Sequence, residues 1–366
     1  MNQEAGPERE SSEVASPPPT RFAMRFLRIS GQGLRALIRT VAMIDFVALL
    51  GHFVRGRAIW LEMLLYLPLV PLGVVVVILG SILASFSKRS EAVAIFALGL
   101  VSIVVGGQWM LGRGPDLQSA VVDPAHTIRV IHWNVLWGGF EPIRSGWASM
   151  VDEIASRSPD LVILSEAASF PQRRQLIARL GTGWNEISAE SPPWQSAYRN
   201  RIAILSRWPM RSVGAPRIRN GSTYEVIVEH PKRPIHLLTI DGKSQPTIPR
   251  SPMLEDIALI CDRAEHSALG PIDIIAGDFN CVGRTRGFDD IREATGGFAP
   301  ASESSTGWRA TWPSWLPIYD IDHVWVRRAN RINSCVLFSR IATDHRGQII
   351  VIDLDHCSSG APGSDT

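Results

Sequence analysis

"IHWNVLWGG", residues 131–139, is an apolar run that is interrupted by one amide, Asn134, and closed by two glycines. Its Ile, Val and Trp residues are typical of a buried β-strand. A buried asparagine without a hydrogen-bond partner would destabilise such a strand by about 1–3 kcal/mol. The rest of the chain must therefore supply a partner for Asn134.

Several other apolar runs in the second half of the chain also end in, or begin at, a carboxylate, an amide or a histidine. The residues at these positions are Asn134, Glu166, Asp278, Asn280, Asp322, Asp344 and His345. One such residue alone is ordinarily a turn former or a helix cap. A series of them along one domain is better explained by a shared site, because strand ends hold functional side chains on a rigid backbone.

The same part of the chain alternates short β-branched runs with amphipathic stretches. "DLVILSEA" (160–167) and "RIAILSR" (201–207) are typical of strands, whereas "GWASMVDEIASRS" (146–158) is typical of a helix. Mixed strands and helices indicate an α/β or α+β domain with buried sheets.

The first third of the chain has a different character. Residues 1–33 are first polar and proline-rich, which predicts disorder, and then basic, and we expect them to form a cytoplasmic tail. Three apolar segments follow, each long enough to cross about 30 Å of hydrocarbon as a helix. These segments are 34–54, 63–86 and 92–111. The first is the weakest because it carries Arg35, Arg39 and Asp45, and an interfacial or buried helix is the alternative for it.

Positive charge sets the expected orientation of these segments. Arginines precede the first segment and favour a cytoplasmic N-terminus. Three spans then place everything after residue 112 outside the cytoplasm, whereas two spans would keep it inside. We adopt three spans and expect a multi-pass membrane protein with an extracytoplasmic C-terminal domain.

The formal net charge of +2 hides an asymmetry between the two parts of the chain. Residues 1–112 carry 10 basic and 7 acidic side chains, and the remainder carries 27 and 28. A domain devoted to gripping nucleic acid would be more basic, so nucleic acid is a candidate partner that the charge does not favour. The four cysteines are scattered without CxxC spacing, which argues against a zinc site.

Taken in order, the strand-end residues resemble the motifs of the endonuclease/exonuclease/phosphatase superfamily of metal-dependent phosphoesterases. "RVIHWNV" (129–135) resembles its first strand, and "DLVILSEA" resembles the strand that ends in a metal-binding Glu. "GDFN" (277–280) is the best-known signature of the family, and "IDHVWV" (321–326) and "TDH" (343–345) complete the set. The apolar N-terminal segments, with "TWPSWLPIYDIDHV", resemble the membrane-anchored bacterial branch.

This resemblance implies a fold and a domain plan. The implied fold is a deoxyribonuclease I-like α/β (α+β) four-layer sandwich, in which two packed mixed β-sheets are flanked by helices, preceded by a transmembrane helical anchor. The expected parts are a tail at 1–33, the anchor at 34–112, a linker at 113–126, the family domain at 127–357 and a disordered tail at 358–366. We expect an integral protein of a bacterial cell membrane, with membrane lipids around its helices, and infer no protein partner.

The resemblance also implies a metal site. Glu166 would hold Mg²⁺, a hard ion that prefers carboxylate oxygens, and Mn²⁺ is an expected substitute. Asp344 would bind a metal ion or lie next to one. Asn134 would orient the carboxylate of Glu166 or a metal-bound water.

The remaining motif residues would carry the catalytic chemistry. Asp278 would deprotonate the attacking water, and Asn280 would donate hydrogen bonds to water or to phosphate. Asp322 would hold the ring of His345 in one tautomer, and the cationic His345 would face the phosphoryl group.

One position departs from the family pattern. Asp241 stands where a phosphate-facing histidine is usual, and a carboxylate about 4 Å from a unit phosphate charge is repelled by about 4 kcal/mol at an effective dielectric of about 20. Three outcomes are open: Lys243 supplies the missing cation, Asp241 binds a second metal ion, or activity is weakened. Tyr198 is a further candidate phosphate contact.

The leading hypothesis is a membrane-anchored, Mg²⁺-dependent phosphoesterase. Its substrate would be a phosphodiester or phosphomonoester of nucleic acid, of a phospholipid head group or of another envelope component, hydrolysed by metal-assisted attack of water. The alternative is a binding module that keeps the fold but has lost turnover through Asp241. A transporter or channel has little support, because the apolar segments lack paired charges.

Overall fold

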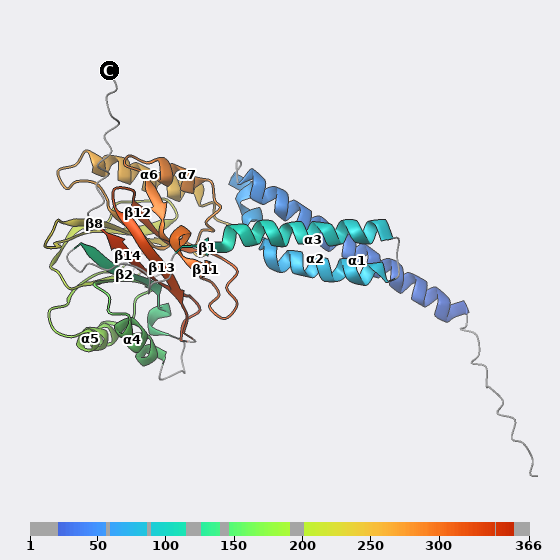
Figure 1. Cartoon of the computed structure of the whole chain (residues 1–366), viewed down its shortest axis with the longest axis horizontal. Coiled ribbons are helices and arrows are strands. Elements are labelled where there is room, and N and C mark those ends of the chain that lie inside the picture. The colour runs from blue at the N-terminus through green and yellow to red at the C-terminus, as the bar shows by residue number, and fades with distance from the viewer. Residues whose placement is uncertain are drawn as a thin grey trace, which may run out of the picture.

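The computed structural model describes residues 21–55, 59–85, 89–114, 126–139, 146–190, 201–340 and 342–354. Figure 1 shows a bundle of long helices that leads into a layered domain of strands and helices. The tail expected at 358–366 and most of the linker expected at 113–126 lie outside the described residues. The first helix begins at Arg21, so the basic part of the expected N-terminal tail is helical.

The N-terminal helices pack closely through glycine. Their bounds are Arg21–Val54 (α1), Leu69–Ala84 (α2) and Arg89–Met110 (α3), with a 3₁₀ helix, η1, at Ile59–Tyr66. A Cβ atom added at Gly73 of α2 would lie 2.7 Å from the carbonyl oxygen of Gly99 of α3, so the two backbones are in contact. Such small-residue contacts are typical of helix pairs in membranes.

Two segments of this bundle are long and apolar enough to cross a membrane, Gln32–Val54 and Arg89–Met110. The apolar segment 63–86, which was expected to be one span, is divided in the structure. Its first residues belong to η1, and α2 begins only after Pro68 and has 16 residues. Proline lacks a backbone N–H and disfavours helix at the residue before it, which accounts for the break.

Two six-stranded mixed sheets form the C-terminal domain, with strand orders β13-β14-β2-β3-β5-β4 and β10-β12-β9-β8-β7-β6. The strands of the first sheet are β2 (Thr127–Asn134), β3 (Leu161–Ser165), β4 (Asn185–Glu190), β5 (Arg201–Ser206), β13 (Arg331–Phe338) and β14 (Gly347–Asp353). Those of the second are β6 (Met210–Gly214), β7 (Gly221–Val228), β8 (Ile235–Gly242), β9 (Ile274–Asp278), β10 (Phe298–Pro300) and β12 (Asp322–Arg327). A short pair, β1 (Leu111–Arg113) with β11 (Thr306–Trp308), joins the end of α3 to the domain.

Each sheet has one face in a central core and one face under helices. Ile128 and Leu161 of the first sheet pack with Leu237 and Ile274 of the second. The outer face of the first sheet lies under α4 and α5, and that of the second under α6 and α7. These helices span Gly146–Ser156, Phe170–Leu180, Ser251–Glu265 and Gly287–Glu293. The expected four-layer sandwich is confirmed.

The register of the strands brings the polar strand ends to one edge of the sandwich. β2 and β3 are parallel, with Asn134 opposite Ser165. β8 and β9 are also parallel, with Asp241 opposite Asp278, and antiparallel β12 places Asp322 on the other side of Asp278. The carboxyl ends of parallel neighbours meet at one edge, where α/β folds usually build their sites.

Candidate active site

A cavity of about 540 Å³ lies at this edge. Residues of both sheets and of the loops that follow their strands line it. They are Leu136, Glu166, Ser244, Pro246, Asp278, Asn280, Trp312, Tyr319, Ile321, Asp344 and His345, and Tyr66 joins them from the N-terminal region. Asn134 and Asp322 are buried and bind the lining residues from behind.

The partner of Asn134 is Asp278. The side-chain Nδ2 of Asn134 donates to Oδ2 of Asp278 at 3.0 Å, and its Oδ1 accepts the backbone N–H of Leu136 at 3.0 Å. The expectation was that Asn134 would orient Glu166 or a metal-bound water, and the structure adds a bond from its amide to Asp278. Hydrogen bonding from Asn134 also opposes the rise in the pKa of Glu166.

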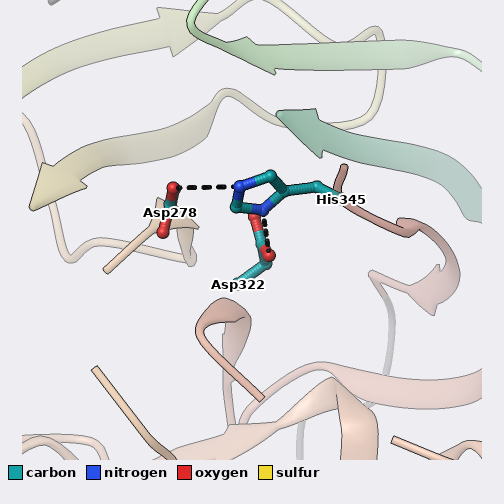
Figure 2. A group of neighbouring side chains, drawn as sticks. All are labelled: Asp278, Asp322 and His345. Atoms are coloured by element: carbon teal, nitrogen blue, oxygen red, sulfur yellow. Dashed lines mark hydrogen bonds and ion pairs between the residues drawn. The ribbon is translucent and has the colours of Figure 1, made fainter. Parts of the chain in front are cut away.

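His345 lies between two carboxylates, as Figure 2 shows. Its Nδ1 donates to Oδ2 of Asp322 at 2.8 Å, and its Nε2 faces Oδ2 of Asp278 at 4.0 Å. The indole N–H of Trp133 donates to the carbonyl oxygen of His345 at 3.0 Å, which fixes the backbone that carries the ring. The expected pairing of Asp322 with His345 is present in the structure.

Burial and neighbouring charge shift the pKa values of this group in opposite directions. Burial first, and then the charge of Asp322, raises the pKa of Asp278. Burial opposes the cationic ring of His345, but the charges of Asp322, Asp278 and Asp344 outweigh it and raise its pKa to about 10. Burial likewise opposes ionisation of Asp322, yet His345 holds the pKa of that carboxyl low. The site therefore pairs a proton acceptor with a fixed cation.

Asp278 receives further support from the loop that follows it. The backbone N–H of Asn280 donates to Oδ1 of Asp278 at 2.9 Å. Asn280 has a positive φ of 48°, a left-handed conformation in which asparagine is enriched. Its side-chain Nδ2 donates to the carbonyl oxygen of Gly242 at 2.9 Å, so in this structure the amide is engaged by the protein.

Two further carboxylates face the cavity and suit a cation. Oδ2 of Asp344 accepts the indole N–H of Trp312 at 3.0 Å, while its buried Oδ1 has no hydrogen-bond partner among the described residues. Burial raises the pKa of Glu166, and the charge of Asp344 raises it further. A carboxylate oxygen without a hydrogen-bond partner, close to a second carboxylate that repels it, fits a hard divalent ion.

Asp278, Asp322 and His345 form another possible metal-binding group, because the atoms with which they could bind a metal ion lie within 4.8 Å of one another. The Nδ1 atom of His345 is already bonded to Asp322, however. These three residues are better suited to proton transfer, and Glu166 and Asp344 are the better candidates for metal binding.

A family model described as "Endonuclease/Exonuclease/phosphatase family" matches residues 131–345, more than half of the chain. The chain belongs to this family. A solved family member from Bacteroides vulgatus is 14% identical, with a TM-score of 0.47, over 63% of this chain and 99% of that one. A mannosyl-6-phosphatase from Bacteroides thetaiotaomicron is 13% identical, with a TM-score of 0.46, over 62% and 99%. No curated protein matches the sequence.

The family position at which this chain carries Asp241 is closed to solvent. Asp241 is buried, and burial together with the charges of Asp278 and Glu166 raises its pKa well above the ordinary value. The folded chain therefore holds the proton of Asp241 more tightly than an ordinary aspartate would, which weakens the expected repulsion of a phosphate. Lys243 is exposed, and the described lining of the cavity does not include it. Tyr198 lies outside the described residues.

The pattern of polar residues at strand ends did not reveal the aromatic residues that line the cavity, Tyr66, Trp312 and Tyr319. Trp312 and Tyr319 come from "TWPSWLPIYDIDHV", where the density of aromatic residues before a site strand was the available signal. Tyr66 gave no such signal, because it stands in an apolar run that resembles a membrane span.

We predict that Asp241→Asn stabilises the metal-free chain more at pH 8 than at pH 4.5. Because its pKa is raised on folding, Asp241 binds its proton more tightly in the folded chain, and its destabilising effect grows as the pH rises above about 3.9, the ordinary Asp value. Asn is neutral at every pH. Thermal unfolding of the full-length protein in detergent with a chelator measures the difference.

The matched control is Asp256→Asn. Arg219 lowers the pKa of Asp256 through hydrogen bonds, so the stability that this carboxylate contributes is lost only below about pH 3.9, and any destabilisation by Asp256→Asn should be nearly the same at pH 4.5 and pH 8. An Asp241→Asn effect that is the same at both pH values would contradict the raised pKa.

Proposed function

We propose that this family member is a metal-dependent phosphoesterase anchored in a membrane. The observation that carries the proposal is the line Asp322–His345–Asp278 at the base of a cavity that also holds Glu166 and Asp344. It places a base, a cation and a pair of carboxylates around one space, which are the groups that hydrolysis of a phosphate ester needs.

In the proposed reaction, Asp278 takes a proton from a water molecule in the cavity. The water oxygen forms a bond to phosphorus, and the bond from phosphorus to the leaving oxygen breaks with its electron pair on that oxygen. His345 remains cationic because Asp322 holds its Nδ1–H, and its Nε2–H faces the developing negative charge. The raised pKa of Asp278 makes it a stronger base than an ordinary aspartate.

Glu166 and Asp344 are the proposed ligands of the metal ion. Mg²⁺ is the proposed ion, since it binds through one or two carboxylates and keeps several waters, and Mn²⁺ should replace it. When bound, the ion would supply electrostatic stabilisation of the phosphoryl oxygens. Asn280 would turn its amide towards the phosphate once substrate fills the cavity.

The proposed anchor is the helix bundle before residue 112. Gln32–Val54 and Arg89–Met110 have the length and composition of spans, and α2 would be a third, shorter one. Inside the bundle, Ser102 donates a hydrogen bond to the buried Asp45 at 2.9 Å, which compensates an acid that hydrocarbon would otherwise disfavour. With the arginines at the start of α1, before the candidate span Gln32–Val54, on the cytoplasmic side, the domain at 127–357 would lie outside the cytoplasm.

The alternative of a binding module without turnover rests on repulsion between Asp241 and phosphate. The raised pKa of Asp241 means that the folded chain holds its proton more tightly than an ordinary aspartate would, which weakens that repulsion and favours the enzyme. The near-neutral charge of the domain counts against nucleic acid as the substrate.

We predict that Asp278→Asn and His345→Ala each lower the rate of hydrolysis of bis(4-nitrophenyl) phosphate by about 10²–10⁴-fold, since each removes a group that moves a proton or stabilises charge. The assay uses the full-length chain in detergent with Mg²⁺. Asp152→Asn and His266→Ala, both on exposed side chains, serve as controls. Unchanged rates in both site variants would contradict the proposed function.

We also predict that a chelator abolishes the activity and that Mg²⁺ or Mn²⁺ restores it. Glu166→Gln should raise the Mg²⁺ concentration for half-maximal activity by about tenfold or more, because even loss of an outer-shell partner costs a metal site about that much. Titration of the chelated protein with Mg²⁺ measures this. A Glu166→Gln variant with an unchanged Mg²⁺ requirement would remove Glu166 from the metal site.

A further inference from the structure

The 3₁₀ helix η1, which follows the first candidate span, is bound directly to the catalytic domain. The carboxylate of Glu62 is buried and accepts the backbone N–H groups of Arg250 at 2.7 Å and Ser251 at 3.3 Å. These groups begin α6, where a negative charge is favoured by the helix dipole. The N-terminal region is therefore built into the domain at this point.

The last residue of η1 reaches the active-site cavity. The hydroxyl of Tyr66 donates to the carbonyl oxygen of Asn280 at 2.8 Å, and the hydroxyl of Tyr319 donates to the carbonyl oxygen of Tyr66 at 2.8 Å. The Tyr319 ring also stacks on Trp312, with centroids 5.9 Å apart. Tyr66, Trp312 and Tyr319 all line the cavity, and we call them the aromatic wall.

An exposed apolar segment follows Trp312 of the aromatic wall in the sequence. Trp315 is 79% exposed and Leu316 is 53% exposed, three and four residues after Trp312. The same loop is tied to the end of α3, because the backbone N–H of Arg309 donates to the carbonyl oxygen of Met110 at 2.9 Å. An exposed indole is favourable where it meets the lipid interface and unfavourable in water.

Resting on the proposed function, we propose that Tyr66 is a substrate-binding residue supplied by the anchor and that the cavity takes an amphiphilic phosphate ester from the lipid surface. The phosphate would bind among Glu166, Asp344 and His345, and the apolar part would lie on the aromatic wall. The cavity of about 540 Å³ is much larger than a phosphate group needs, and its two sides match a molecule with one charged and one apolar end.

The test compares two esters with the same chemistry: methyl 4-nitrophenyl phosphate and hexadecyl 4-nitrophenyl phosphate. In both, water adds to phosphorus, the bond to the aryl oxygen breaks and 4-nitrophenolate leaves, so only the tail differs. The full-length protein in detergent micelles with Mg²⁺ is assayed on each ester. The readout is the ratio of kcat/KM for the hexadecyl ester to that for the methyl ester.

The wild type should prefer the hexadecyl ester, and Tyr66→Ala should lower the ratio by about tenfold, equivalent to about 1.4 kcal/mol. Tyr66→Phe keeps the ring and should keep the ratio. Met63→Ala is the matched control, because Met63 lies on the same helix with an exposed side chain. Comparing the two variants separates binding of the tail by Tyr66 from enrichment of the ester in micelles. Turnover of the methyl ester reports on folding, and Tyr66→Leu, which retains apolar bulk, should lower the ratio less than Tyr66→Ala.

The outcomes separate the two claims. No hydrolysis of either ester by the wild type contradicts the proposed function and this inference with it. Hydrolysis of both esters with equal efficiency, or a ratio that Tyr66→Ala and Tyr66→Leu leave unchanged, overturns the inference alone. A ratio that falls equally in Met63→Ala would likewise overturn it, because the effect would then belong to the helix and not to the wall.

Discussion

The hydrogen bond between Asn134 and Asp278 joins the two sheets of the sandwich at the site. Asn134 ends β2 of the first sheet and Asp278 ends β9 of the second, 144 residues later in the chain. His345, just before β14, bonds to Asp322 of β12 and so crosses the same boundary. The position of the base relative to the cation thus depends on how the sheets pack, and the buried core between them keeps that distance fixed.

The same edge concentrates negative charge. Asp241, Asp278 and Asp322 are all buried within it, and Glu166 and Asp344 face its cavity. Two features of the chain offset this charge: His345 stays cationic, and Asp241, whose pKa burial raises, holds its proton more tightly than an ordinary aspartate does. The proposed metal ion at Glu166 and Asp344 would offset the rest. A phosphate is itself an anion, so an edge with this much negative charge can bind it only when cations offset that charge.

The sequence was sufficient to predict the fold and the carboxylates, amide and histidine around the cavity, because each strand-end motif is a local pattern of apolar and polar residues. It did not identify the partner of Asn134, since that contact is set by packing between sheets. Hydropathy merged η1 with α2, because it measures apolar character and not the break at Pro68. Tyr66 was missed for the same reason, and the state of Asp241 depends on burial that only the structure shows.

The pH dependence of kcat/KM for the wild type and for Asn134→Ala tests the central claim most directly. The Asn134 amide donates to the Asp278 carboxylate and holds its pKa lower than burial alone would. Without that bond the pKa of Asp278 rises, so more of the base is protonated at a given pH. The account predicts that the acid limb of the profile moves to higher pH in Asn134→Ala. A limb at the same pH, with activity lowered equally throughout, would contradict it.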